Sequence, residues 1–166
     1  INCKTLEYRY APLQMGNLKF LLVDTKKERS LSSSVYNDRV ASVKEAVRII
    51  RQEKDIEFLT DIEDISSYKD KLSEETFRRA LHIVEENKRV VEAVSCLENS
   101  DFDSFGELMY QSHKSLKELY EVSCRELDFI VEFSKNIRGV KGARLTGAGM
   151  GGCCLVLISE KCIPTF

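Results

Sequence analysis

The sequence lacks the features of several large classes of proteins. No apolar run approaches the roughly 18 residues that a membrane-spanning helix needs. The formal net charge is only -2, which gives no electrostatic reason to expect a nucleic acid or an anionic membrane as a partner. The first residues, INCKTLEYRYAP, lack the basic segment and the following apolar segment of a signal peptide. We therefore expect no membrane partner, no nucleic-acid partner and no secretory leader.

The patterns of metal sites and disulfide frameworks are also missing. The six cysteines form no C-x-x-C pair, and both histidines lie far from them along the chain. Cys153 and Cys154 are adjacent in an apolar run typical of a buried strand, where cysteine acts as a small hydrophobic residue. Without a secretory signal, this pattern favours free thiols in a reducing, cytoplasmic compartment. The sequence predicts no metal site.

What is present fits one globular domain, with 43% hydrophobic and 31% charged residues over 166 positions. Apolar residues recur at helical spacing through the middle of the chain, and short strand-like runs stand near both ends. The predicted strands cover residues 6–10, 18–23, 142–146 and 153–158, with a turn at 15–17. Helices between flanking strands predict an α+β fold and not an alternating α/β fold.

Polar residues mark where the predicted helices begin. The first helical pattern starts at about residue 33. Ser73 is a candidate N-cap for a long helix that runs to about residue 97, and Asp101 or Asp103 is a candidate for the next. Ser123, three residues before a glutamate, has the spacing of a capping box.

The densest cluster of glycines lies in residues 145–153, LTGAGMGGC, between two predicted strands. Glycine permits positive φ and lets backbone N–H groups approach a ligand, so this loop can bind a phosphate or another anion. It fits equally well as a tight connection that packs against a helix. The residues alone leave both interpretations open. Neither the lysine of a P-loop nor the acidic residue of a Rossmann crossover accompanies the loop.

Polar residues at the start of the first predicted helix are weaker candidates. The serines of residues 30–34 can hold phosphate oxygens with the help of the helix dipole, but plain N-capping explains them as well, and we favour it. Tyr36, in the polar first turn, can offer its phenol to a sugar hydroxyl or simply cover an edge of the core.

The histidines and carboxylates form no recognisable catalytic set. His82 shares its helix with several charged residues, which favours a structural hydrogen bond, whereas His113 can be structural or catalytic. Glu85 and Glu86 are expected on a solvated face. The acidic segment 55–70 is expected to be a surface connection with about one helical turn.

Four ordered motifs resemble the galactokinases, a branch of the GHMP small-molecule kinases. Residues 142–153, GARLTGAGMGGC, resemble the third signature of that family. Residues 24–39 are similar to the galactokinase segment around its sugar-contacting tyrosine, and residues 79–89 resemble its long helix. Residues 105–116 and 120–128 resemble the helix pair before the glycine loop.

The resemblance runs from the first residues to about residue 158, and it implies roles for individual residues. Tyr36 matches the tyrosine that hydrogen-bonds galactose. Ser30, with Arg29 beside it, lies where the family approaches the nucleotide phosphates. The glycine loop would close over the reaction centre and brace the nucleotide loop. It comprises Thr146, Gly147, Ala148, Gly149, Met150, Gly151 and Gly152.

By resemblance, the fold is the C-terminal domain of a GHMP kinase, ferredoxin-like, with helices packed on an antiparallel sheet. Residues 1–16 would end the N-terminal kinase domain or form a connecting strand, and residues 17–166 would be the C-terminal domain, incomplete at its C-terminus. The full-length protein would be a cytoplasmic galactokinase. It would use ATP and Mg²⁺ to phosphorylate the anomeric hydroxyl of galactose.

The motifs that hold the sugar and the ATP in this family, and the aspartate proposed as its base, have no counterpart in these residues. No catalytic residue and no metal ligand is therefore predicted in this chain, and the chain alone is expected to be inactive. Two alternatives stay open. One is a galactokinase-like sensor that binds sugar and ATP without catalysis. The other is a GHMP kinase for another small substrate, such as N-acetylgalactosamine or mevalonate.

Overall fold

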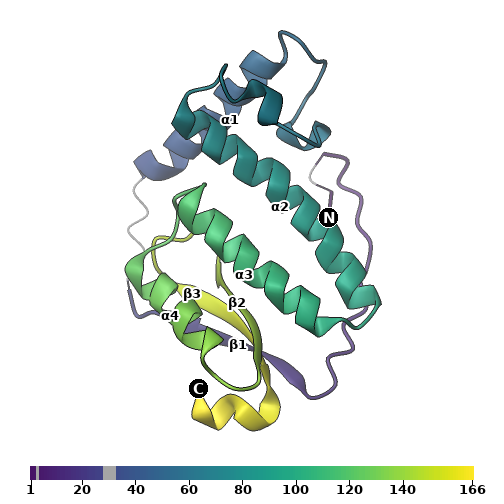
Figure 1. The fold of residues 1–166 in the computed structure, drawn as a ribbon, viewed down its shortest axis with the longest axis vertical. Helices are drawn as coiled ribbons and strands as arrows, with labels where there is room; N and C mark the ends of the chain where they lie inside the picture. The colour runs from purple at the N-terminus through teal and green to yellow at the C-terminus, as the bar shows by residue number, and fades with distance from the viewer. Residues whose placement is uncertain (3, 28–32) are drawn as a thin grey trace.

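The chain alternates little between strand and helix: strands lie near its ends and helices fill its middle (Figure 1). The computed structural model describes residues 1–2, 4–27 and 33–166. The elements follow in the order β1 Leu18–Asp24, α1 Ser33–Ile50, η1 Leu59–Asp61, η2 Ser66–Tyr68, α2 Glu74–Glu98, α3 Phe102–Glu118, α4 Arg125–Lys135, β2 Val140–Thr146, β3 Cys153–Ser159 and η3 Glu160–Thr165, where η marks a short 3₁₀ helix. The predicted α+β fold is confirmed.

The three strands form one antiparallel sheet in the order β1-β3-β2. At one end of the sheet, Asp24 of β1 and Thr146 of β2 both lie opposite Cys153 of β3. The glycine run is the connection of the β2–β3 hairpin, so it projects from this same end. The register therefore brings residues 24–27 next to the glycine loop, although more than 120 positions separate them in the sequence.

Successive side chains of β3 point to opposite faces of the sheet, and both faces are covered. Cys154, Val156 and Ile158 pack with Leu127 and Val131 of α4. On the other face, residues 155 and 157 pack with Met109 of α3 and with aromatic side chains that precede it. Because β3 is buried on both faces, its sequence is a continuous apolar run, without the alternation of apolar and polar residues found in a half-buried strand.

Helix α3 lies directly against the edge strand β2. A Cβ placed on Gly106 would lie 2.1 Å from the carbonyl oxygen of Lys141, and one placed on Gly142 would lie 2.3 Å from the carbonyl oxygen of Gly106. Only glycine at both positions permits this approach. The Leu145 amide of β2 then donates to Nδ1 of His113 at 3.2 Å, so a helix side chain satisfies a strand amide.

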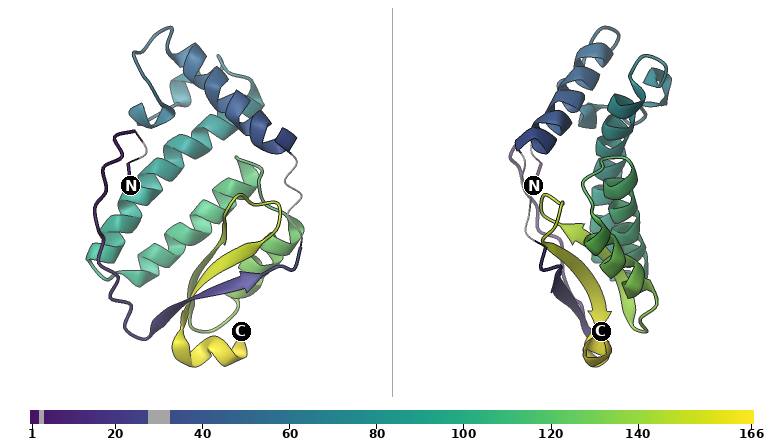
Figure 2. Two further views of the ribbon diagram at one scale, coloured as in Figure 1. Left: turned by 180° about the vertical axis from the view of Figure 1, so that it is seen from behind. Right: turned by 90° about the vertical axis from the view of Figure 1, so that its left-hand side faces the viewer.

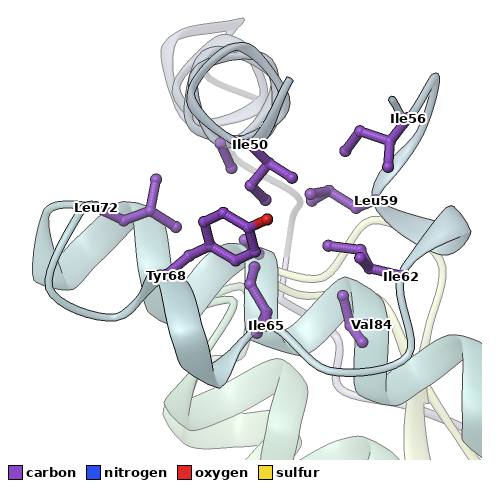
Figure 3. Packing of buried hydrophobic residues seen from close by; sticks show 10 residues of the cluster. Ile50, Ile56, Leu59, Ile62, Ile65, Tyr68, Leu72 and Val84 are labelled. Atoms are coloured by element: carbon purple, nitrogen blue, oxygen red, sulfur yellow. The ribbon is translucent and has the colours of Figure 1, made fainter. Parts of the chain in front are cut away.

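Beyond α3, helices α2 and α1 follow in succession away from the sheet, as the two further views show (Figure 2). A second hydrophobic core fills the space between α1, α2 and the segment that joins them (Figure 3). Ile50 and Ala46 of α1 and Val84 and Ala80 of α2 are its helical members.

The prediction that residues 55–70 form a surface connection is wrong. The apolar side chains of this segment, and of Leu72 after it, are buried in the second core, where they are Ile56, Leu59, Ile62, Ile65, Tyr68 and Leu72. They recur every three or four positions, a spacing that suits the short 3₁₀ turns η1 and η2. The acidic residues between them face outward and conceal this apolar period in the sequence.

The first predicted strand is also absent from the described part of the chain. Residues 6–10 form no ladder there, Leu6 has a φ of 61°, and Tyr8 and Tyr10 are largely exposed. An alternating pattern is not enough for a strand when no neighbouring strand supplies hydrogen-bond partners. The turn at residues 15–17 is confirmed, with Gly16 at a φ of 54°.

Two of the predicted helix caps are confirmed and one is wrong. Ser73 accepts the amide of Thr76 at the start of α2, and Asp101 accepts the amide of Ser104 at the start of α3. The capping box at α4 does not form, since Cys124 is the N-cap residue there and makes no side-chain cap bond.

The hydroxyl of Ser123 is instead used by a carboxylate of α4. It donates to Oδ1 of Asp128 at 2.6 Å, and the same carboxylate pairs with His113 and Lys117 of α3. In a capping box the serine hydroxyl would accept a backbone N–H, whereas here it donates a charge-assisted hydrogen bond to a carboxylate of α4.

Candidate functional site

The glycine loop follows a left-handed path over most of its length. Gly147, Gly149 and Gly152 have φ near 81°, Gly151 has 134°, and Met150 is the one non-glycine loop residue in this region, at 59°. Side chains rarely adopt these conformations, so the composition of the run follows from its backbone. Thr146 closes β2 immediately before the loop.

Two contacts anchor the loop to the rest of the molecule. The Met150 amide donates to the carbonyl oxygen of Val122 at 2.9 Å. A Cβ placed on Gly149 would lie 1.9 Å from that same oxygen. At its far end, the Gly152 carbonyl accepts from the amide of Thr25 at 2.8 Å and from its hydroxyl at 2.7 Å. The loop is therefore a fixed turn that packs on the connection between α3 and α4 and on the end of β1.

Two loop amides, those of Gly147 and Ala148, are open to a ligand, whereas Gly149 and Gly151 are buried. Within the described part of the chain, the amides of Gly147, Ala148, Gly149 and Gly151 donate to no protein acceptor. Successive amides in a left-handed path can converge on an anion. The two interpretations from the sequence are thus compatible, because this connection is tight and still offers amide donors.

Tyr36 lies in the first turn of α1 and is 71% exposed. It does not cover an edge of the core, and its phenol is open to a ligand. Burial raises the pKa of Tyr120, and Tyr36 lies near enough to raise it further. Tyr36 therefore stands close to the α3–α4 connection on which the glycine loop is anchored.

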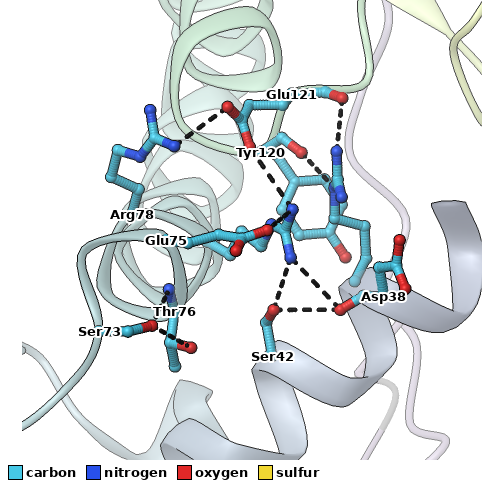
Figure 4. Close-up of polar contacts among 10 residues, drawn as sticks. Asp38, Ser42, Ser73, Glu75, Thr76, Arg78, Tyr120 and Glu121 are labelled. Carbon is cyan, nitrogen blue, oxygen red and sulfur yellow. Dashed lines mark hydrogen bonds and ion pairs between the residues drawn. The ribbon is translucent and has the colours of Figure 1, made fainter.

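Arg39, one turn after Tyr36, fixes α1 to that connection. Its Nε donates to the carbonyl oxygen of Tyr120 at 2.6 Å, and its Nη2 donates to that of Glu121 at 2.8 Å (Figure 4). Burial is the main effect that lowers the pKa of Arg39, and the nearby Arg79 adds to it.

Two further arginines hold the side chain of Glu121. Arg78 Nη2 lies 3.1 Å from one carboxylate oxygen and Arg79 Nη2 lies 3.6 Å from the other. Arg79 is buried, and it also donates to Ser42 of α1 at 2.7 Å and pairs with Glu75 (Figure 4). Sequence reasoning missed this cluster, because its members come from α1, α2 and the α3–α4 connection, about 40 positions apart.

His82 has the structural role that its surroundings in the sequence indicated. Its Nδ1 lies 2.8 Å from the hydroxyl of Ser115, and its ring stacks on Tyr120 with 4.6 Å between the ring centroids. Burial lowers the pKa of His82 to about 4, so the ring is neutral at physiological pH.

His113, for which both roles were open, is also held on both sides. Its Nδ1 accepts the Leu145 amide, and its Nε2 lies 3.2 Å from Asp128. Burial lowers the pKa of His113, although Asp128 opposes the shift. Because a backbone amide occupies Nδ1, this ring orients a strand and offers no free base.

The prediction that Glu86 is solvated is wrong. Its carboxylate accepts from Ser112 of α3 and from Arg89 at 2.8 Å, and lies 3.4 Å from Arg144 of β2. Burial acts to raise the pKa of Glu86, but the hydrogen bonds from Ser112 and Arg89 outweigh it and leave the pKa below its ordinary value. Two of the three partners, Ser112 and Arg144, lie on other elements, so the local pattern of α2 does not show them.

Two predicted site residues, Arg29 and Ser30, lie outside the described residues. Among the residues that the structure does describe, no group of three or more histidine, cysteine, aspartate or glutamate side chains is arranged to bind a metal ion. The described part of the chain also has no helix of the length and apolarity that spanning a membrane requires.

Comparisons with known proteins agree with this geometry. The family model described as GHMP kinases C terminal matches residues 93–161. A galactokinase from Clostridium tetani is 40% identical over 169 residues, which cover 100% of this chain and 43% of that protein.

Solved structures separate two branches of the family. The crystal structure of Lactococcus lactis galactokinase complexed with galactose matches with a TM-score of 0.95 and 35% identity, over 99% of this chain and 43% of that one. The mevalonate kinase of Methanococcus jannaschii matches with a TM-score of only 0.53 and 26% identity, over 91% of this chain and 35% of that one.

The chain thus spans less than half the length of the galactokinases that it matches. Over 99% of its length the chain follows the fold of the Lactococcus lactis galactokinase. Residues 93–161 carry the C-terminal domain of the GHMP kinases, and over its whole length the chain is similar to the C-terminal part of the galactokinases.

Proposed function

We propose that this chain is part of a galactokinase, which transfers the γ-phosphoryl group of ATP to the anomeric hydroxyl of galactose. The observation that carries the proposal is the match to a galactokinase solved with galactose, which covers 99% of the chain. The much lower TM-score against a mevalonate kinase favours galactose over mevalonate as the acceptor. We assign residues 1–16 to the end of the N-terminal kinase domain and residues 17–166 to the C-terminal domain.

Tyr36 is the proposed galactose contact in this chain. Its exposed phenol can donate to one sugar hydroxyl and accept from another. The glycine loop, from Thr146 to Gly152, borders the reaction centre, and Ser30 approaches the nucleotide. The amides of Gly147 and Ala148 are exposed and suit the oxygens of a phosphate group.

The chemistry requires mainly positioning and the stabilisation of negative charge. In this chain the loop amides provide fixed dipoles at no cost of reorganisation, because two anchors hold the loop before any ligand arrives. ATP supplies the phosphoryl group, and Mg²⁺, when bound, neutralises its charge. We assign Mg²⁺ no ligand in this chain. His82 and His113 are committed to structural hydrogen bonds, so we assign neither as the base.

Galactose and ATP are the proposed small-molecule partners, and we propose a cytoplasmic location. The support for a reducing compartment is the cysteine spacing of the sequence, which has no C-x-x-C pair.

The full-length protein that carries this chain tests the proposal. Coupled measurement of ADP release should show turnover with galactose and none with mevalonate. Binding of galactose and ATP without ADP release would instead favour a non-catalytic sensor, and faster turnover with N-acetylgalactosamine would change the assigned substrate.

The Tyr36→Phe variant tests the sugar contact. Loss of one hydrogen bond to the substrate should raise the KM for galactose about tenfold, while the KM for ATP stays unchanged. Tyr68→Phe is the control, since Tyr68 lies in the second core (Figure 3). An unchanged KM for galactose in Tyr36→Phe would remove Tyr36 from the binding site.

The isolated 166-residue chain should have no kinase activity, because the family motifs for ATP and the catalytic base have no counterpart in it. ADP release with galactose above the no-enzyme control would contradict this expectation.

A further inference from the structure

We propose that Arg39 and Glu121 are positioning residues, which hold Tyr36 in a fixed place relative to the glycine loop. The inference rests on the proposed function, because it takes Tyr36 and the loop as two parts of one site. It adds one structural element to that site, the three-residue segment 120–122. This segment is bonded both to the helix that carries Tyr36 and to the glycine loop.

The first part of this arrangement is the fork of Arg39. Two nitrogens of one planar guanidinium donate to two successive carbonyl oxygens, those of Tyr120 and Glu121, at 2.6 and 2.8 Å. Arg39 is 8% exposed, so water competes little for these bonds. A lysine at this position has no planar fork and can reach the two oxygens only from a single nitrogen. The fork therefore fixes the orientation of the start of α1, which carries Tyr36, as well as its distance from the segment 120–122.

The second part is the backbone of Glu121. Its φ of 57° is unfavourable for a residue with a side chain and persists where the surroundings over-determine it. Three guanidinium groups do so here. Arg39 binds its carbonyl oxygen, while Arg78 and Arg79 bind its carboxylate. The strained conformation is thus held by a hydrogen bond from α1 and by two ion pairs from α2.

The third part is the next residue, Val122. Its carbonyl oxygen accepts the Met150 amide at 2.9 Å and lies 1.9 Å from the place that a Cβ on Gly149 would take. Met150 is also strained, with a φ of 59°. Since the conformation of Glu121 determines where the following carbonyl points, a change at Glu121 or Arg39 is transmitted to the loop over one peptide unit.

The test uses the full-length protein that carries this chain, with the variants Arg39→Lys and Glu121→Gln. We expect the KM for galactose to rise about tenfold in Arg39→Lys and about threefold in Glu121→Gln. We also expect the amide of Met150, measured by hydrogen exchange of peptides that cover residues 146–152, to exchange faster in both variants. A merely structural role would lower the melting temperature and the amount of active enzyme, but would leave the KM unchanged.

The matched controls are Arg48→Lys and Glu45→Gln. These two residues form an ion pair on the exposed side of the same helix and touch neither the loop nor the segment 120–122. Both controls should keep the wild-type KM and the wild-type exchange rate. If Arg39→Lys does not fold, Glu121→Gln decides alone, because its side chain is 37% exposed and the change removes only charge.

Unchanged KM and unchanged exchange in a folded variant would overturn the proposal. The hydrogen-exchange measurement also separates it from the proposed function. If the wild-type protein does not phosphorylate galactose, the proposed function fails, yet faster exchange of residues 146–152 in the variants alone would still support the positioning role.

Discussion

Gly149 illustrates how a single residue limits the site. It has both a left-handed backbone, with a φ of 81°, and a carbonyl oxygen where its Cβ would be. Gly16 has a left-handed backbone too, with a φ of 54°, but open space around it. The two positions therefore separate the effect of backbone conformation from the effect of steric overlap.

Gly149→Ala should be much more destabilising than Gly16→Ala. The first change should lower the free energy of unfolding by roughly 2–4 kcal/mol, because the overlap with a backbone oxygen adds to the strain, and the second by about 1 kcal/mol. Urea denaturation of both variants measures the difference. Equal effects would show that the loop can move away from Val122 without loss.

His82 makes the stability of the fold depend on pH. Its pKa falls from 6.5 to about 4 on folding, because the ring is buried. Between these two values the unfolded chain binds a proton that the folded chain does not. The free energy of unfolding should therefore decrease as the pH falls from about 6.5 towards 4, by roughly 2–3 kcal/mol from this group.

The variant His82→Gln should lose this part of the pH dependence. Urea denaturation between pH 7 and pH 4.5 should give a smaller slope of unfolding free energy for the variant than for the wild type. A residual slope is expected from His113, whose pKa burial also lowers. Identical slopes would mean that His82 titrates at its ordinary pKa in the folded state.

At the scale of elements, the segment between α1 and α2 is the largest departure from expectation. Its apolar side chains give α1 a partner, since one face of α1 would otherwise be exposed above α2 (Figure 3). This packing holds the helix that carries Tyr36 and Arg39. The segment therefore supports the candidate site without contributing a residue to it.

Ile65→Ala tests this supporting role. Ile65 is fully buried, and its truncation should lower the free energy of unfolding by about 3 kcal/mol. Phe58→Ala is the control within the same segment, because Phe58 is 42% exposed, and it should have an effect below about 1 kcal/mol. Denaturant midpoints measure both. Similar small losses would mean that the segment is loosely packed and does not hold α1.

At the scale of the whole molecule, the thiols report on the integrity of the sheet. Cys154 of β3 is fully buried, and burial raises its pKa to about 12, whereas the other described cysteines are partly exposed. None of these five forms a disulfide.

A thiol reagent should therefore react slowly with Cys154 in the native protein and rapidly after unfolding in denaturant. The melting temperature should be the same with and without a reducing agent. Fast native labelling of Cys154, identified by peptide mapping, would contradict the burial of β3 on both faces.

The sequence predicted those features that depend on neighbouring positions. The spacing of the apolar residues predicted α1, α2 and the three strands of the sheet, because this spacing shows which face of an element is buried. Ser73 and Asp101 cap their helices as predicted, because a cap bonds only three residues onward. The four motifs, in their order along the chain, predicted a similarity to the galactokinases, and the comparisons confirmed it. The strand predicted at residues 6–10 was wrong, because a strand also needs a neighbouring strand, and a local pattern does not show whether one is present.

Most of what holds the candidate site together was decided by the tertiary structure alone. The sequence by itself determined the glycine-rich loop between two strands and the helix that carries Tyr36. It did not show that Arg39 meets carbonyl oxygens 81 and 82 positions away, or that His113 satisfies an amide 32 positions away. Such contacts join residues whose local patterns are ordinary, and only the packing of α1, α2 and α3 on the sheet brings their charges and amides within bonding distance.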